Sequence, residues 1–177
     1  MTTQQNVVQS TIDEKIKKYS GSCHCQACRF ECTGSPIFRV ICHCSICTRL
    51  SGGIAVAFVG FENSQLEIID GSDYLQSYKA TDRMERFRCR ICGSNVYNQS
   101  LLIDRQFRDT PLTNFQTDDH GVIIELDQLK PDGHINFERC QNCYSDMFKY
   151  DGLVKFSAMP GSTVIENHPS SIANSSN

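Results

Sequence analysis

The sequence predicts a single mainly β domain, and three features lead to this prediction. Short stretches that alternate apolar and polar side chains are separated by turns rich in Gly, Pro, Ser and Asp, a pattern typical of strands. No segment keeps the apolar spacing of a helix for long enough to predict a long one. The cysteines gather in short-range clusters, which favours strands that are cross-linked by a bound metal. The 177 residues suffice for one such domain and are few for two.

The expected strands follow one another with a turn after most of them. Residues 28–32 alternate like a half-buried strand, and residues 54–59 form an apolar run that suits a strand buried on both faces. Residues 104–119 are polar and irregular, which predicts a surface loop. The other expected strand segments are residues 37–41, 66–69, 75–78, 84–87, 95–97, 122–126 and 134–137, with turns at 34–36, 51–53 and 70–72.

The two ends of the chain differ from the middle in composition. Residues 1–19 are polar and predict a flexible N-terminal tail, although the spacing of Ile12 and Ile16 also allows a short helix there. Residues 158–177 are rich in Ser and Asn and predict a loose C-terminal tail. The expected folded domain therefore covers residues 20–157.

Charge and hydropathy argue against several classes of function. The formal net charge is −3, whereas a nucleic-acid partner usually requires a basic face. No apolar run approaches the roughly 18 residues of a membrane span, and the polar N-terminus lacks the apolar core of a targeting signal. The odd number of cysteines, 11, fits metal binding better than a disulfide framework. We therefore expect a cytoplasmic or nuclear protein that binds neither nucleic acid nor membrane.

The cysteine clusters are the candidate functional residues. The pattern C-x-C-x-x-C occurs at residues 23–28 and again at residues 42–47, and a C-x-x-C-G knuckle occupies residues 89–93. Thiolates at these spacings converge on one soft cation, for which zinc is the usual choice. The knuckle supplies two ligands and needs two more, which Cys23 and Cys25 can supply, and the central cluster then keeps an open fourth position.

Spacing alone leaves other divisions of the cysteines open. Cys28 could join the first cluster, or the knuckle could pair with the central cluster instead. The central cluster could also be a second structural site whose fourth ligand is a residue such as Cys28. A structural zinc has four protein ligands, whereas a catalytic zinc keeps a position for water or substrate. The division therefore decides whether an enzyme is expected.

The residues around these clusters also carry a family resemblance. The segments concerned are Gly21-Ser22-Cys23-His24-Cys25, Cys42-His43-Cys44-Ser45-Ile46-Cys47 with Ser51-Gly52 behind it, Phe87-Arg88-Cys89-Arg90-Ile91-Cys92-Gly93-Ser94, and Asp151-Gly152-Leu153 near the C-terminal end. With seven cysteines in the same order, residues 20–157 resemble the glutathione-dependent formaldehyde-activating enzyme and centromere protein V family.

The resemblance implies a fold, a set of ligands and an activity. The implied fold is Mss-four-like, with several coiled β-sheets stapled by zinc. The implied activity is that of a carbon–sulfur lyase, which joins glutathione and formaldehyde into S-hydroxymethylglutathione. Two zinc ions per chain are implied, a structural zinc held by Cys23, Cys25, Cys89 and Cys92 and a catalytic zinc held by Cys42, Cys44 and Cys47.

The residues suit this chemistry, because a thiolate and not a thiol is the nucleophile toward an aldehyde carbon. A free thiol with a pKa of ~8.5 is mostly protonated at neutral pH, and binding to zinc deprotonates it. We expect glutathione or another small thiol to bind opposite the central cluster and add to a small aldehyde. The sequence indicates no general base and no oligomeric state.

Two other functions remain open from the sequence. The first is a non-catalytic, zinc-stabilised binding module of the centromere protein V type, although this chain lacks a long basic extension. The second is a related lyase that acts on another thiol adduct. The open zinc position distinguishes both lyases from the binding module.

Several side chains near the clusters have more than one interpretation. Cys28, Cys32, Cys140 and Cys143 exceed the family pattern and could hold a third zinc or act as small apolar residues. Neighbouring side chains in extended backbone point to opposite sides, so we expect His24 and His43 to face away from the metal. His134 is a substrate contact or a surface histidine. The run Arg83, Arg86, Arg88 and Arg90 predicts a solvated strand face, or else cations that screen the thiolates or bind glutathione carboxylates.

Overall fold

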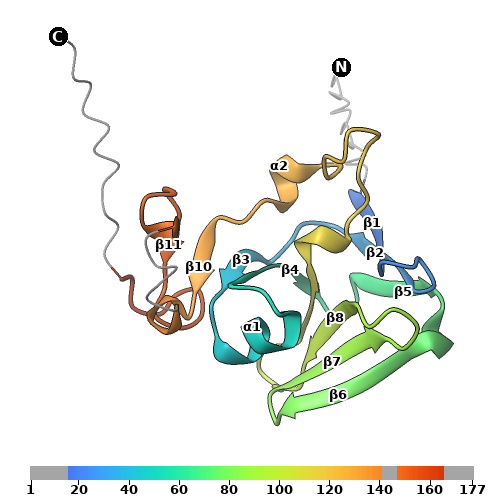
Figure 1. Ribbon diagram of the computed structural model, residues 1–177, viewed down its shortest axis with the longest axis horizontal. Helices are drawn as coiled ribbons and strands as arrows, with labels where there is room; N and C mark the ends of the chain where they lie inside the picture. Colours follow the sequence, from blue (N-terminus) through green and yellow to red (C-terminus); the bar gives the residue numbers. More distant parts are fainter. Residues whose placement is uncertain (1–15, 141–146, 166–177) are drawn as a thin grey trace, which may run out of the picture.

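The structure is a computed structural model that describes residues 16–140 and 147–165. Within these ranges the strands form an eight-stranded sheet in the order β11-β10-β3-β4-β9-β8-β7-β6 and a three-stranded sheet in the order β1-β2-β5. Figure 1 shows the larger sheet running from β11 on the left to β6 at the lower right, with the smaller sheet beside it. The prediction of a mainly β domain is confirmed, and the Mss-four-like assignment stays a prediction.

The smaller sheet is antiparallel. Its central strand β2 (Arg29–Thr33) pairs with β1 (Lys18–Ser22) on one side and β5 (Leu66–Asp70) on the other. Phe30 and Cys32 are fully buried on β2, because alternate side chains of a strand point to the same face. The strand predicted at residues 28–32 is therefore confirmed.

The larger sheet is antiparallel from β3 to β6 and parallel where β10 joins β3 and β11. Its strands are β3 (Phe38–Cys42), β4 (Val56–Glu62), β6 (Leu75–Thr81), β7 (Met84–Cys89), β8 (Asn95–Ser100), β9 (Phe107–Pro111), β10 (Gly133–Ile135) and β11 (Val154–Lys155). The described helices are short: α1 (Ser45–Ser51), α2 (Leu126–Leu129), and the 3-10 turns η1 (Ser72–Tyr74), η2 (Leu112–Asn114) and η3 (Phe137–Arg139).

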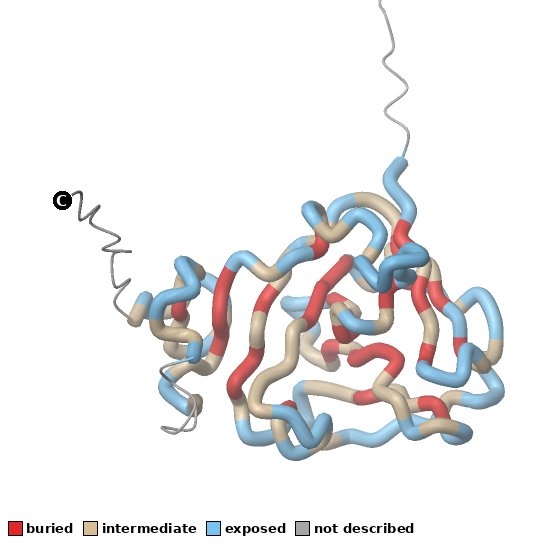
Figure 2. Tube along the Cα trace, turned by 45° about the horizontal axis from the view of Figure 1, so that its top comes forward, coloured by how far each residue is buried: buried red, intermediate tan, exposed pale blue. Residues whose placement is uncertain are grey.

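The two faces of the larger sheet have different partners. Val59 and Phe61 of β4 pack in one core cluster with Tyr19 of the smaller sheet. Phe58, which points to the opposite face, packs in a second cluster with Cys42 and neighbouring residues. In Figure 2 the buried residues lie mostly in the interior of the molecule, whereas many of the outer turns are exposed. The second face is therefore the one that carries the central cysteines.

Gly60 allows β4 to lie against the ring of Phe38. The two residues are register partners, and a Cβ on residue 60 would lie 2.2 Å from Phe38 Cζ. Phe107 packs edge-on against the same ring, with 5.1 Å between the ring centroids, so the ring has little room to move. We expect Gly60→Ala to lower the free energy of unfolding by about 1–3 kcal/mol in denaturant titrations. The loss should be smaller in a Phe38→Leu background, and an unchanged stability of Gly60→Ala would contradict this packing.

The surface loop expected at residues 104–119 is wrong in its centre, because β9 lies between β4 and β8 in the larger sheet. Polar side chains of β9 are buried with polar partners. Thr110 Oγ1 donates to the backbone oxygen of Val96 at 2.8 Å, and Asp109 accepts a hydrogen bond from Asn98 at 2.5 Å. Two of the polar residues that predicted a loop, Asp109 and Thr110, thus belong to an internal hydrogen-bond network.

The strand expected at residues 122–126 is also wrong. The Asp118 carboxylate accepts hydrogen bonds from the backbone N–H groups of His120 and Val122, each at 2.9 Å, and so closes a turn. The chain then enters α2 at Leu126. An isolated bridge between Thr117 and Ile123 stands in place of a strand.

The predicted tails lie mostly outside the described residues, which exclude 1–15 and 166–177 and with them the helix considered near Ile12. Residues 158–165 are described, and Val164 forms an isolated bridge with Phe156. The boundaries at residues 20 and 157 stay predictions. Within the described ranges, no helix is long and apolar enough to cross a membrane.

Candidate metal centre

Four cysteines from two distant segments form the first thiol cluster. Cys23 and Cys25 follow β1, whereas Cys89 ends β7 and Cys92 lies in the turn after it. Their four Sγ atoms lie within 4.8 Å of one another, with 3.6 Å between Cys23 and Cys25 and 3.8 Å between Cys25 and Cys89. Zn–S bonds of about 2.3 Å in a tetrahedral site place the sulfurs about 3.8 Å apart, so these four thiols fit zinc.

Tight backbone turns produce this spacing. Gln26 has a φ of 61° and Gly93 a φ of 77°, both in the left-handed region that tight turns use. The N–H of Gln26 donates to the oxygen of Cys23 at 2.9 Å, and the N–H of Gly93 donates to the oxygen of Cys89 at 2.8 Å. The two ligands of each segment are thereby brought to one side of the backbone.

Three cysteines around the start of α1 form the second thiol cluster, called the trio below. Cys42 ends β3, Cys44 is the N-cap of α1, and Cys47 lies in the first turn of this helix. Cys44 Sγ accepts a hydrogen bond from the Cys47 N–H at 3.4 Å, in the manner of an N-cap side chain. The three Sγ atoms lie within 4.8 Å of one another, so the trio could hold zinc with three protein ligands.

Within the described ranges, no fourth Cys, His, Asp or Glu joins the trio. Cys28 lies elsewhere, because its thiol donates to the oxygen of Gly71 at 3.5 Å and its side chain packs in the core cluster that contains Tyr19. The alternative in which Cys28 completes the second cluster is therefore wrong.

The extra cysteines do not gather into a third cluster in the described part of the chain. Cys28 and Cys32 are fully buried in one core cluster, where they act as small apolar side chains. Cys140 forms no group of three ligands with them. Cys143 lies outside the described residues.

The thiols of the trio are too close to ionise together without a cation. Hydrogen bonds from Cys42 and Cys47 lower the pKa of the Cys44 thiol, whereas hydrogen bonding to Cys44 and Cys47 raises the pKa of the Cys42 thiol. One sulfur therefore takes the negative charge and the others donate to it. A divalent cation removes this conflict, because every thiolate then becomes a ligand. The donor set of the trio thus fits zinc on chemical grounds as well.

A cavity of about 150 Å³ opens beside the trio and is lined by all three of its cysteines. Most of its wall is apolar and comes from side chains such as Phe38, Phe58 and Phe107. Its polar lining residues are Arg86, Asn98, Asp109 and Asn136. A small apolar molecule with one polar atom therefore matches this cavity.

The polar groups of the cavity are connected to the trio. Arg86 Nη2 donates to Cys47 Sγ at 3.5 Å and Nη1 donates to Asn98 Oδ1 at 3.1 Å, while Asn98 Nδ2 donates to Asp109 Oδ1 at 2.5 Å. Arg86 is only 7 % exposed, so the solvated face predicted for the arginine run is wrong at this position. Burial raises the pKa of Asp109 to about 7, and the Asn98 hydrogen bond and the Arg86 charge offset only part of this shift.

A second, more polar cleft of about 280 Å³ adjoins the cavity. The two share Cys47, Phe58 and Arg86 as lining residues. The cleft extends to Arg88, which lies two residues from Arg86 on the same face of β7 and donates to the oxygen of Leu50 at 2.9 Å. A longer polar molecule in this cleft could therefore reach the trio with one end.

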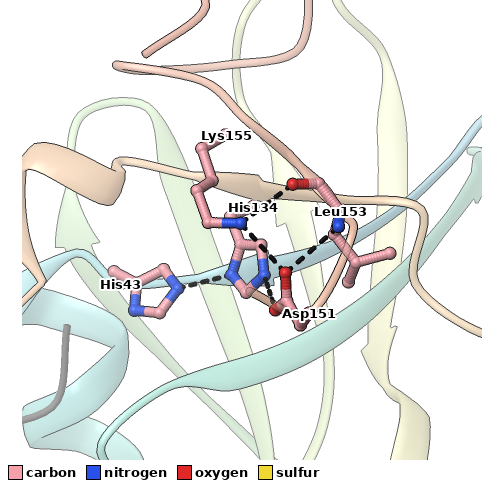
Figure 3. A network of polar contacts seen from close by, with 5 residues as sticks. All are labelled: His43, His134, Asp151, Leu153 and Lys155. Carbon is pink, nitrogen blue, oxygen red and sulfur yellow. Dashed lines mark hydrogen bonds and ion pairs between the residues drawn. The ribbon is translucent and has the colours of Figure 1, made fainter. Parts of the chain in front are cut away.

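The side chain of His43 points away from the trio, as expected for a residue between two ligands. Figure 3 shows it directed at His134, with 2.7 Å between Nε2 of His43 and Nδ1 of His134. The other nitrogen of His134 lies 2.6 Å from Asp151 Oδ2, and Lys155 Nζ donates to Asp151 Oδ1 at 2.9 Å. His134 is fully buried, so the surface position expected for it is wrong. It does not line the cavity, and the substrate contact considered for it stays a prediction. His24, in contrast, is exposed.

This network holds the backbone that carries two ligands of the trio. Burial lowers the pKa of both imidazoles, that of His43 to about 4, so both rings are neutral at pH 7. Phe137 and Phe148 pack edge-on against the two rings. The His43 N–H also donates to the oxygen of Ile135 at 3.1 Å. Such contacts behind a ligand loop fix the orientation of its metal-binding side chains.

We expect His134→Ala to lower the free energy of unfolding, because it leaves His43 Nε2 and the Asp151 carboxylate without this partner. The loss comes mainly from His43, because a buried polar group without its partner costs about 1–3 kcal/mol, whereas Asp151 is partly exposed and keeps its contact with Lys155. Denaturant titration of the zinc-loaded protein measures the change, with the exposed His120→Ala as the matched control. Equal stability of the two variants would contradict this role for the network.

A family model, a curated protein and a solved structure each match part of this chain. A family model described as "Glutathione-dependent formaldehyde-activating enzyme" matches residues 18–139. A curated protein of Halomonas elongata, provisionally named a glutathione-dependent formaldehyde-activating enzyme, is 32% identical over 85 residues, which cover 44% of this chain and 53% of the relative. The aligned part thus spans about half the length of that relative. A crystal structure of a Rhodobacter sphaeroides protein has a TM-score of 0.47 and 19% identity, covering 57% of this chain and 92% of that one.

Proposed function

Because the chain belongs to the glutathione-dependent formaldehyde-activating enzyme family, we propose that it makes and breaks a carbon–sulfur bond between a small thiol and a small aldehyde. The proposed substrates are glutathione and formaldehyde, and the product is S-hydroxymethylglutathione. The observation that carries the proposal is the trio, which lines a cavity and has no fourth protein ligand within the described ranges.

The two thiol clusters have different roles in this proposal. Their different surroundings support the division, since only the trio lines the apolar cavity. When bound at the trio, zinc supplies the positive charge that keeps a substrate thiol ionised at neutral pH. The structural zinc is assigned to Cys23, Cys25, Cys89 and Cys92, and the catalytic zinc to Cys42, Cys44 and Cys47.

The polar cleft is the proposed site for the thiol substrate. Glutathione carries two carboxylates, and the guanidinium of Arg88 at the cleft wall is suited to bind one of them. Because the cleft and the cavity share Cys47, a thiol at one end of the ligand can meet an aldehyde in the cavity. Arg88 would then make the contact with a glutathione carboxylate that the sequence analysis considered for the arginine run.

The chain's own side chains prepare the cavity for an aldehyde. Arg86 holds Cys47 by a hydrogen bond and adds a positive charge beside the trio. Asn136 Nδ2 donates to Cys42 Sγ at 3.7 Å, which orients a second sulfur. Apolar walls such as Phe58 exclude water, which strengthens the electrostatic interactions inside.

Exchange NMR with isotopically labelled formaldehyde tests the proposed reaction. The zinc-loaded protein should accelerate the interconversion of glutathione, formaldehyde and their adduct beyond the uncatalysed rate. A panel of other small thiols, measured in the same way, identifies a different thiol substrate if glutathione is not the best. A binding module of the centromere protein V type predicts no acceleration with any thiol, and that result would overturn the proposal.

We also propose an Mss-four-like arrangement of the sheets, which the family resemblance implies. A cytoplasmic or nuclear location is proposed from the composition of the chain.

A further inference from the structure

One row of register partners crosses the larger sheet beneath the cavity. Arg86 of β7 lies opposite Asn98 of β8, Asn98 lies opposite Asp109 of β9, and Asp109 lies opposite Gly60 of β4, which faces Phe38 of β3. The side chains of this row point to the face that carries the trio, because four of the five residues line the cavity and Gly60 has no side chain. The sheet therefore places a carboxyl group and a guanidinium on the same wall of the proposed aldehyde site.

Asp109 is an unusual residue for a merely structural role. It is 7 % exposed, and its polar contact within the described ranges is the single hydrogen bond from Asn98. Arg86 reaches it through Asn98 rather than by an ion pair. A buried carboxyl without a direct cationic partner favours its protonated form. At neutral pH it can therefore give a proton as well as take one.

Arg86 is the second unusual member of the row. Its side chain is buried, and its Nε–H has no hydrogen-bond partner within the described ranges. Two of its other nitrogens bind Cys47 and Asn98. A buried cation in an apolar wall stabilises negative charge that develops in the adjoining cavity.

We propose that Asp109 is the catalytic acid and base of the site, exchanging a proton with the aldehyde oxygen while Arg86 stabilises the charge on that oxygen. This inference rests on the proposed thiol–aldehyde reaction and assigns the general base that the sequence did not indicate. The chemical class that it requires is a small aldehyde in the forward direction and its hemithioacetal in reverse.

Protons and electrons balance in this step. In the forward direction the thiolate sulfur forms a bond to the carbonyl carbon, and the π electrons of the C=O bond move to the oxygen. That oxygen takes the proton of the Asp109 carboxyl. The proton that the substrate thiol lost on ionisation returns Asp109 to its acid form. In reverse, the Asp109 carboxylate removes the hydroxyl proton as the carbon–sulfur bond breaks. The step needs no oxidant or reductant.

The variant Asp109→Asn tests the assignment, because an amide oxygen can still accept the hydrogen bond from Asn98 but cannot give an acidic proton. We expect kcat for adduct formation to fall by about 100-fold or more, the usual range for a lost acid–base group. Zinc content and the affinity for glutathione should not change. Asp82→Asn, which makes the same substitution at an exposed turn, is the matched control and should keep full activity.

A pH profile separates an acid–base role from a structural one. Since Asp109 must be protonated to act as the acid, the wild-type rate of addition should fall as pH rises through about 7, the pKa of the buried carboxyl. The other titratable or charged groups that face the cavity are Arg86 from β7, Cys42 from β3, Cys44 at the N-cap of α1 and Cys47 from α1. Strands β4 and β8 contribute none. Asp109→Asn keeps all of these, so this fall should be absent from the variant.

A carboxyl-carbon NMR titration of protein labelled at aspartate Cγ supplies a readout that does not depend on activity. One aspartate should titrate near pH 7 in the wild-type protein, and its signal should move when formaldehyde is added. If Asp109→Asn does not fold, this titration decides the matter, and the absence of such a carboxyl overturns the inference. If the wild-type protein and Asp109→Asn have equal rates and pH profiles, the role of Asp109 is overturned but the proposed reaction is not. If the wild-type protein gives no acceleration, both the role of Asp109 and the proposed reaction are overturned.

Discussion

Replacing Cys89 by serine is expected to unfold most of the domain. Cys89 lies 64 residues from Cys25 in the chain, yet their sulfurs are 3.8 Å apart. A zinc ion at this cluster therefore joins the loop after β1 of the smaller sheet to the end of β7 in the larger sheet. Structural zinc contributes about 10–16 kcal/mol of apparent binding free energy in small zinc domains. This exceeds or matches the roughly 5–15 kcal/mol by which most domains are stable.

Circular dichroism, soluble yield and zinc content measure this effect. The Cys89→Ser variant should lose zinc and the circular dichroism signal of its β-strands. Removal of zinc from the wild-type protein by a strong chelator should abolish the same signal. Cys32→Ala is the matched control, because Cys32 is buried but belongs to neither cluster. It should remain folded with a modest loss of stability. A Cys89→Ser protein with normal zinc content and stability would show that this cluster does not hold the sheets together.

Replacing Cys44 by serine is expected to abolish turnover while the fold remains. The ligands of the trio all lie between residues 42 and 47, so a metal there closes a loop of a few residues and does not connect distant segments. Closure of such a short loop contributes little to the stability of the whole domain. Loss of one ligand should nevertheless remove the metal, because two thiols remain where zinc requires three or four protein ligands.

The expected result for Cys44→Ser is one zinc ion per chain in place of two, an unchanged circular dichroism spectrum, and exchange between glutathione and formaldehyde at the uncatalysed rate. Ser45→Ala changes the neighbouring residue outside the ligand set and should behave like the wild-type protein. Full activity of Cys44→Ser would exclude the trio as the catalytic site.

The cysteine clusters could be predicted from the sequence because their ligands are close together along the chain or repeat a known spacing. The direction of His43 could be predicted as well, since extended backbone sends neighbouring side chains to opposite sides. Its partner could not, because His134 meets it through the parallel pairing of β10 with β3, 91 residues further along the chain.

The polar wall of the cavity was not predicted for a related reason. Asp109 lies in a segment whose composition is typical of a loop, and its burial depends on strands that pair across distant parts of the chain. Arg86 lies on β7, where alternate side chains point to opposite faces of the sheet, and the strand register decides which face each side chain takes. Asn98 lies opposite Arg86 on one side and Asp109 on the other, which indicates a polar row across the sheet. This row can be recognised only when the register of β7, β8 and β9 is known.

The most direct measurement is the visible spectrum of the cobalt-substituted protein during titration with glutathione. Cobalt at the trio should change its ligand-field bands as the thiol of glutathione joins Cys42, Cys44 and Cys47, and the spectrum of Cys44→Ser should not respond. A wild-type spectrum that stays constant at saturating glutathione would contradict an open position at the trio and favour two closed structural sites.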